Sequence, residues 1–80
     1  MIGVVADDLT GAAELAGIGW RYGLQSEVVT APGRHSEAEL VCVDTDSRSC
    51  APAEASERAA AAVRNLVASG ASRIYKKVDS

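Results

Sequence analysis

Residues 2–12 read IGVVADDLTGA, and this stretch decides the fold of the chain's N-terminal part. The apolar run over residues 2–6 is typical of a short buried strand, and it ends in two adjacent carboxylates, Asp7 and Asp8. The Thr-Gly pair that follows is expected to open a helix. Because ligands of open α/β sheets bind beyond the carboxyl ends of the strands, we predict a binding site at this junction.

The same alternation of strand and helix continues along the chain. Further strands are predicted over residues 26–30, 39–44 and 73–78. One helix is predicted from residue 10 to about 22 and ends before Gly23, and a second has Pro52 in its first turn and Gly70 just past its end. The strands are too continuously apolar for a sheet with one wet face. The sequence therefore predicts an α/β fold with an open, mostly parallel sheet and flanking helices, in the order β-α-β-β-α-β.

Each predicted helix has an apolar stripe at three- and four-residue spacing. The first stripe consists of Leu9, Ala13, Ala16 and Trp20, and the second of Ala59, Ala62 or Val63, Leu66 and Val67. We expect Trp20 and Tyr22 to pack in the core or at the helix end. Gly17 and Gly19 suggest close packing of the first helix on the sheet, and Glu54 and Arg58 are spaced to form an ion pair on the wet side of the second.

Composition limits the size and class of the protein. Eighty residues make at most one small domain, and aromatic residues are only 4%, so the chain resembles the front piece, residues 1–80, of a larger domain. The net charge of -3 argues against a nucleic-acid surface.

The chain lacks a signal-peptide pattern and a membrane-length apolar run, which predicts a cytoplasmic protein without a membrane partner. Cys42 and Cys50 fit two reduced thiols, with neither a zinc pattern nor a disulfide framework.

In a parallel sheet, the carboxyl ends of all four strands point to one edge. That edge would gather carboxylates, hydroxyls and basic groups from each strand end: Asp7, Asp8 and Thr10; Thr30 with Arg34 and His35; Asp44, Thr45, Asp46, Ser47, Arg48 and Ser49; and Lys76, Lys77, Asp79 and Ser80. The opposite edge receives fewer carboxylates, hydroxyls and basic groups. Because arginine binds carboxylates and aspartate binds hydroxyls, this mixture suits a ligand that carries both groups.

Each of these residues also has a purely structural interpretation. Asp7 or Asp8 can cap the first helix, and Ser47 or Ser49 can cap the second. Arg48 can be a solvated surface charge, and His35 fits a solvated turn. Lys76 and Lys77 alternate along a strand, so one of them is expected to face away from the site.

Familiar phosphate-binding motifs are missing. The sequence contains neither G-x-x-x-x-G-K-[ST] nor G-x-G-x-x-G, and the adjacent acids disfavour a haloacid-dehalogenase nucleophile. A signalling receiver domain also places paired acids after its first strand, an aspartate after its third and a lysine later. Here Lys77 follows Asp44 too soon for that pattern. A receiver-like or other stand-alone α/β binding module is therefore the alternative hypothesis.

Three ordered blocks resemble the four-carbon acid sugar kinase family: VADDLTGA at 5–12, DTDSRS at 44–49 and YKKVDS at 75–80. The resemblance implies an ATP-dependent kinase acting on erythronate, threonate or their 3-oxo forms. Residues 1–80 would be part of its sugar-acid-binding N-terminal domain. A separate C-terminal domain, absent from this chain, would carry most of the ATP and Mg²⁺ site, so the 80 residues alone should be inactive.

The resemblance also implies roles for individual residues. The substrate-binding set would be Asp7, Asp8, Thr10, Ser47, Arg48, Lys77, Asp79 and Ser80. Arg48 or Lys77 would hold the substrate carboxylate, and Asp7 and Asp8 its hydroxyls. Asp79 would accept the proton of the attacking hydroxyl, with Asp8 as the competing candidate. The partners implied are a small sugar acid and ATP, and a homo-oligomer is possible.

Overall fold

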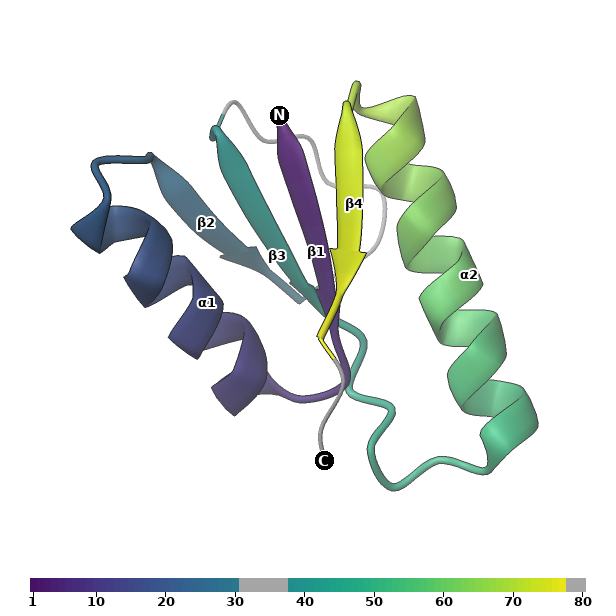
Figure 1. Ribbon diagram of the computed structural model, residues 1–80. Coiled ribbons are helices and arrows are strands. Elements are labelled where there is room, and N and C mark those ends of the chain that lie inside the picture. Colours follow the sequence, from purple (N-terminus) through teal and green to yellow (C-terminus); the bar gives the residue numbers. More distant parts are fainter. Residues whose placement is uncertain (31–37, 78–80) are drawn as a thin grey trace.

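The computed structural model describes residues 1–30 and 38–77, which form one sheet with a helix on each face (Figure 1). The elements in chain order are β1 (Ile2–Ala6), α1 (Leu9–Arg21), β2 (Ser26–Val29), β3 (Leu40–Asp44), α2 (Pro52–Ala68) and β4 (Arg73–Lys76). The predicted α/β class and element order are confirmed, with boundaries within one or two residues.

All strand pairs in the described sheet are parallel, and the strand order is β2-β3-β1-β4. Ala6 at the end of β1 is paired with Asp44 at the end of β3, and Val5 is paired with Lys76 of β4. The carboxyl ends of these three strands are therefore level, as the sequence predicts, and the residues that follow them meet at one edge.

Side chains alternate between two small cores, one on each face of the sheet. Under α1, the buried cluster is Val4, Ala6, Ala12, Ala16, Leu40 and Cys42. Under α2, it is Val5, Val29, Val41, Val43, Ala62 and Leu66. Because helices cover both faces, the strands can be apolar at successive positions, which is why they lack the polar alternation of a one-faced sheet.

The predicted apolar stripe of α1 is largely wrong. Its buried residues are Gly11, Ala12, Ala16 and Gly19, whereas Leu9 and Trp20 are 56% and 62% exposed and Ala13 is exposed. Tyr22, expected in the core or at the helix end, is 82% exposed. The reason is that α1 lies close to the sheet, since a Cβ at Gly19 would lie 2.6 Å from Cδ2 of Leu40 in β3. Gly17, in contrast, has nothing within 4 Å. The fully buried positions of α1 are therefore small residues, whereas Leu15 is half-buried against the core and Leu9, Ile18 and Trp20 are exposed.

The stripe of α2 is partly correct. Ala62 and Leu66 are buried and Ala59 is half-buried, but Val63 and Val67 are 38% and 59% exposed. Leu66 occupies the space over β1, where a Cβ at Gly3 would lie 2.8 Å from its Cδ1. Leu66 is the larger of the two buried residues of α2, and it packs over Gly3 of β1.

Both predicted helix stops are confirmed by backbone geometry. Gly23 and Gly70 have φ values of +82° and +94°, which glycine adopts without steric cost.

Across residues 1–30 and 38–77, none of the helices combines the length and hydropathy needed to cross a bilayer.

Candidate functional site

The topology creates a switch point between β1 and β3. These strands are neighbours, yet the chain leaves β1 toward α1 on one face and leaves β3 toward α2 on the other (Figure 1). Ligands of doubly wound sheets bind in the crevice that such a divergence opens. A hollow of about 220 Å³ lies here, and its polar lining is Asp7, Thr45, Ser47, Arg48, Ser56 and Lys76.

The turn between β1 and α1 is organised by Asp8. Its Oδ1 accepts a 2.7 Å hydrogen bond from the amide of Gly11, so Asp8 is the cap of α1, as one structural interpretation predicted. Its Oδ2 lies 2.6 Å from Nη1 of Arg48. Asp8 therefore joins the first helix to the loop that follows β3. Asp7 does not cap the helix, and it lines the hollow instead.

These contacts fix the charge of Asp8. The hydrogen bond from the Gly11 amide, followed by that from Arg48, lowers the pKa of the Asp8 carboxyl below its usual 3.8. A carboxylate with a depressed pKa is a weak proton acceptor at neutral pH. Asp8 is thus ionised at neutral pH, with one carboxylate oxygen bound by the Gly11 amide and the other paired with Arg48.

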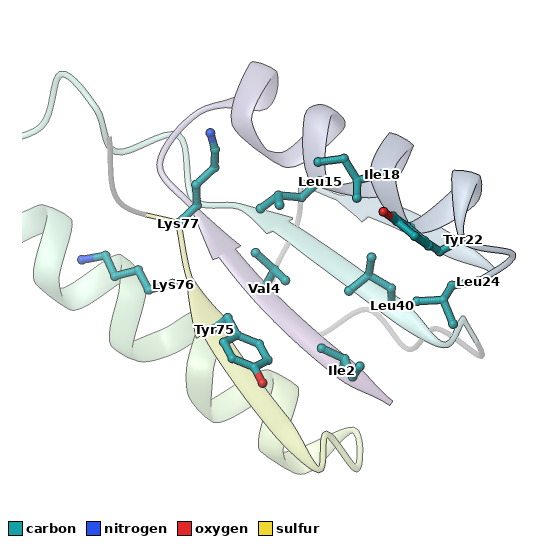
Figure 2. Close-up of a pocket in the computed structure, with 11 residues that line it drawn as sticks. Ile2, Val4, Leu15, Ile18, Tyr22, Leu24, Leu40, Tyr75, Lys76 and Lys77 are labelled. Atoms are coloured by element: carbon teal, nitrogen blue, oxygen red, sulfur yellow. The ribbon is translucent and has the colours of Figure 1, made fainter. Parts of the chain in front are cut away.

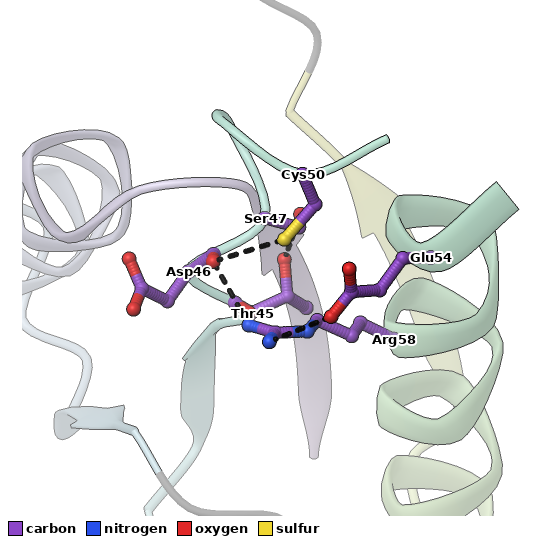
Figure 3. Close-up of polar contacts among 6 residues, drawn as sticks. All are labelled: Thr45, Asp46, Ser47, Cys50, Glu54 and Arg58. Atoms are coloured by element: carbon purple, nitrogen blue, oxygen red, sulfur yellow. Dashed lines mark hydrogen bonds and ion pairs between the residues drawn. The ribbon is translucent and has the colours of Figure 1, made fainter. Parts of the chain in front are cut away.

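The loop after β3 is fastened to the end of β1 through its backbone. The amides of Ser47 and Arg48 both donate to the carbonyl of Asp7, at 3.0 and 3.2 Å. The amide of Thr45 donates to the carbonyl of Ala6 at 2.9 Å. The Thr45 and Ser47 hydroxyls lie 2.7 Å apart (Figure 3), and Ser47 is only 6% exposed. Two hydroxyls and one guanidinium are therefore held at the same crevice.

The predicted serine cap of α2 is wrong. The cap position is Ala51, which offers no side-chain hydrogen bond, and Pro52 follows at the first turn. Ser47 lies too far before the helix, and its hydroxyl is paired with Thr45. The expected Glu54–Arg58 ion pair is present, with Oε1 and Nη2 3.1 Å apart.

Lys76, the last residue of β4, and Lys77 directly after it point to opposite faces of the sheet, as their alternation predicts (Figure 2). Lys77 extends toward α1, where its Nζ lies 3.7 Å from Oε2 of Glu14, and its Cδ would lie 3.1 Å from a Cβ at Gly11. Lys76 lines the hollow beside Ser47 and Arg48. Lys76 was expected at this edge but, unlike Lys77, was not among the residues to which the resemblance gave a role, and Ser56 is a lining residue that no sequence motif indicated.

A larger groove of about 430 Å³ lies on the α1 face, next to β4 (Figure 2). Its walls are mostly apolar and include Leu15, Ile18, Leu24 and Tyr75. Lys76 and Lys77 also line it and offer positive charge to a carboxylate, but the mostly apolar walls offer few partners for the several hydroxyls of a sugar acid. Chemistry therefore favours the smaller polar hollow, despite its lower volume.

Other predicted site residues lie elsewhere. Thr10 is exposed in the first turn of α1 and does not line the hollow. Thr30 lines a separate hollow with Asp44 and Asp46. Asp79 and Ser80, together with Arg34 and His35, lie outside the described residues. Within residues 1–30 and 38–77, no three acidic, cysteine or histidine side chains are grouped so that they could hold a metal ion.

Both cysteines are free, as expected. Cys42 is fully buried in the core under α1, and this burial raises the pKa of its thiol to about 11. Its thiol is therefore protonated at neutral pH and acts as a small apolar side chain in the core.

The comparisons with known proteins agree with this geometry. A model of a sugar-binding N-terminal domain matches residues 2–80. The chain is 41% identical over 86 residues to a D-threonate kinase of Bordetella bronchiseptica, covering 99% of this chain and 21% of the kinase. It is 45% identical over 87 residues to a D-threonate kinase of Cupriavidus necator, covering 96% of this chain and 19% of the kinase. The chain thus spans about a fifth of the curated relatives.

A solved structure has the same fold. A chain from Salmonella typhimurium LT2, provisionally named a tRNA synthase, superposes with a TM-score of 0.88 at 32% identity. The match covers 95% of this chain and 19% of that one. The family match extends over almost the whole chain and includes all three sequence blocks. The chain therefore belongs to the sugar-binding N-terminal domain family, that of the four-carbon acid sugar kinases.

Proposed function

We propose that this chain is the sugar-acid-binding part of an ATP-dependent kinase for four-carbon acid sugars, with D-threonate as the first candidate substrate. The observation that carries the proposal is the polar hollow at the β1–β3 switch point, where hydroxyls, a carboxylate, a guanidinium and an ammonium group converge. The names of the two curated relatives support the kinase and the substrate. We also propose that the protein acts in the cytoplasm.

The polar groups match the chemistry of a tetronate. Such a molecule has one carboxylate and several hydroxyls within four carbons. Arg48 and Lys76 offer positive charge to the carboxylate, because both line the hollow. Asp7 and the Thr45–Ser47 hydroxyl pair offer acceptors and donors to the substrate hydroxyls. Lys77 is a second candidate for the carboxylate only if its side chain leaves Glu14.

Phosphoryl transfer depends on positioning the attacking hydroxyl and on neutralising charge. This chain would supply the first function. ATP with Mg²⁺ would supply the phosphoryl group, and the resemblance assigns most of that site to a C-terminal domain. The proton acceptor in this proposal is Asp79, and a homo-oligomer stays a prediction.

A chimeric enzyme tests the kinase proposal. The matching fifth of the Bordetella D-threonate kinase is replaced by this chain, and ADP release is measured with D-threonate, L-threonate, D-erythronate and 3-oxo-tetronates. We expect substrate-dependent ADP release with at least one of these acids. Asp7→Asn in the chimera should lower kcat/KM by at least about tenfold, because a hydroxyl loses its charged acceptor.

Two controls keep the result interpretable. Threitol has the hydroxyls of threonate without its carboxylate, so it should not support ADP release. Ala60→Ser changes an exposed position on α2 and should leave kcat/KM unchanged. A folded chimera that binds ATP but is silent with every acid would refute the proposed substrate class.

A further inference from the structure

The geometry points to Arg58, on α2, as a positioning residue that holds the β3–α2 loop in its ligand-binding shape. The inference rests on the proposed function, because it concerns the same hollow. Arg58 does not line that hollow. Its side chain lines a different one, of about 330 Å³, together with Thr45 and Asp46. Its effect on a ligand would therefore be transmitted through the loop.

One guanidinium makes three contacts there (Figure 3). Nη1 donates to the carbonyl of Asp46 at 2.9 Å and to that of Thr45 at 3.2 Å. Nη2 donates to Oε1 of Glu54 at 3.1 Å. The planar fork of arginine fits this task, since it can hold two successive carbonyls while its other nitrogen pairs with a carboxylate. The contact with Glu54 in turn orients the guanidinium along α2.

The loop needs such support at this point. Asp46 has φ of +49°, a left-handed conformation that is costly for a residue other than glycine. Its amide is held by Oδ1 of Asp44 at 2.8 Å, and its carbonyl by Arg58. The helix that follows provides no capping side chain at Ala51. Contacts from outside the loop therefore stabilise its unusual backbone.

The carbonyl groups and the amide groups of the loop are held by different partners. Its carbonyls at Thr45 and Asp46 are bound by Arg58, and its next two amides, at Ser47 and Arg48, are bound by the carbonyl of Asp7. This division leaves the side chains of Thr45, Ser47 and Arg48 to line the hollow. Without the guanidinium, the peptides at 45 and 46 can rotate, and these three side chains lose their common orientation.

The test introduces four variants into the chimeric kinase described above and compares them by calorimetric titration with D-threonate. Arg58→Ala should weaken binding about tenfold, since charge-assisted hydrogen bonds to the loop are lost. Arg58→Lys retains the charge without the fork and should weaken binding by about threefold. Glu54→Gln removes only the helix ion pair, and Arg64→Ala removes an exposed positive charge from the same helix. Both of these should stay within about twofold of the unaltered chimera.

Amide hydrogen exchange without ligand separates positioning from a general loss of stability. Arg58→Ala should raise exchange at Ser47 and Arg48 by about tenfold, while core amides such as those of Val41 and Leu66 keep their rates. Should Arg58→Ala fail to fold, Arg58→Lys must still show the local increase.

Two results would overturn the inference. The first is unchanged exchange at Ser47 and Arg48 in both Arg58 variants. The second is an equal loss of affinity in Glu54→Gln and Arg58→Ala, because the helix ion pair would then be the cause. If the unaltered chimera does not bind D-threonate, the proposed function fails, while the exchange rates still decide whether Arg58 holds the loop.

Discussion

The β1–α1 unit and the β3–α2 unit start from neighbouring strands but are built in opposite ways. The first has a two-residue turn that is capped by its own Asp8, and its helix packs on the sheet through Gly19 and alanines. The second has a longer loop without a capping side chain, and its helix is anchored by Leu66. The helix of the first unit is capped locally by Asp8, whereas the loop of the second is held by contacts with Asp7 and Arg58, which lie outside it.

The largest expected effect concerns the anchor of α2. Leu66→Ala should lower the free energy of unfolding by about 3 kcal/mol, because it leaves a cavity over Gly3. The matched control is Val67→Ala, at a neighbouring position that is 59% exposed, which should cost less than about 0.5 kcal/mol. Urea denaturation measures both. Equal losses would show that α2 is not anchored through Leu66.

The next-largest effect concerns the close packing of α1 on the sheet. The test is whether each substitution raises or lowers the stability of the chain. Gly19→Ala should destabilise the chain by about 1–3 kcal/mol, because the new Cβ would overlap Leu40. Gly17→Ala, where nothing lies within 4 Å, should stabilise it by up to about 1 kcal/mol through better helix propensity. Thermal unfolding measures the stability of both variants. Stability changes of the same sign would contradict the described packing.

The sequence predicted the β1–α1 turn well and the β3–α2 loop poorly, for a physical reason. Asp8 caps a helix three residues away, so a short motif contains all the information. The β3–α2 loop depends on Asp7 and on Arg58, which contact it only after the chain has folded. No local pattern in 44–51 reveals those contacts, and a serine in that loop resembled a cap that it does not form.

The predicted stripe of α1 failed for a related reason. Hydrophobicity ranks Trp20 above Gly19 for burial, but the distance between α1 and the sheet allows only a small residue. Period-two alternation showed that Lys76 and Lys77 face opposite ways, yet the choice between them depends on which face holds the hollow. That face is fixed by the topology, which appears only when the strand order is known.

A pH titration examines the Asp8 cap in the turn between β1 and α1. The pKa of Asp8 is lower in the folded chain than its usual 3.8, so its carboxylate stabilises the fold above that value. This stabilisation is lost as the pH falls from about 3.8 through the lower folded-state pKa. The stability difference between the unaltered chain and Asp8→Asn should therefore be constant from pH 7 to about pH 5 and shrink below that. A difference that persists at pH 2 would rule out the charge of Asp8 as its source.

The smallest effect comes from giving α2 the cap that it lacks. Ala51→Asp places an acceptor at the cap position and should stabilise the chain by about 0.5–1 kcal/mol. Ser49→Ala should change stability by less than about 0.5 kcal/mol, since no cap is lost. Chemical denaturation of both variants checks the difference between the two units directly. A stability loss in Ser49→Ala comparable to that of a missing cap would reinstate the serine as the helix cap.

The most direct measurement is an NMR titration of this chain with D-threonate, which follows every backbone amide. We expect saturable shifts at Asp7, at residues 45, 47 and 48 and at Ser56, which line the switch-point hollow and not the apolar groove. Amides beside the apolar groove, such as those of Ile18 and Tyr75, should stay unchanged. Shifts that cluster at the groove, or no saturable shifts at all, would contradict the assignment of the polar hollow as the sugar-acid site.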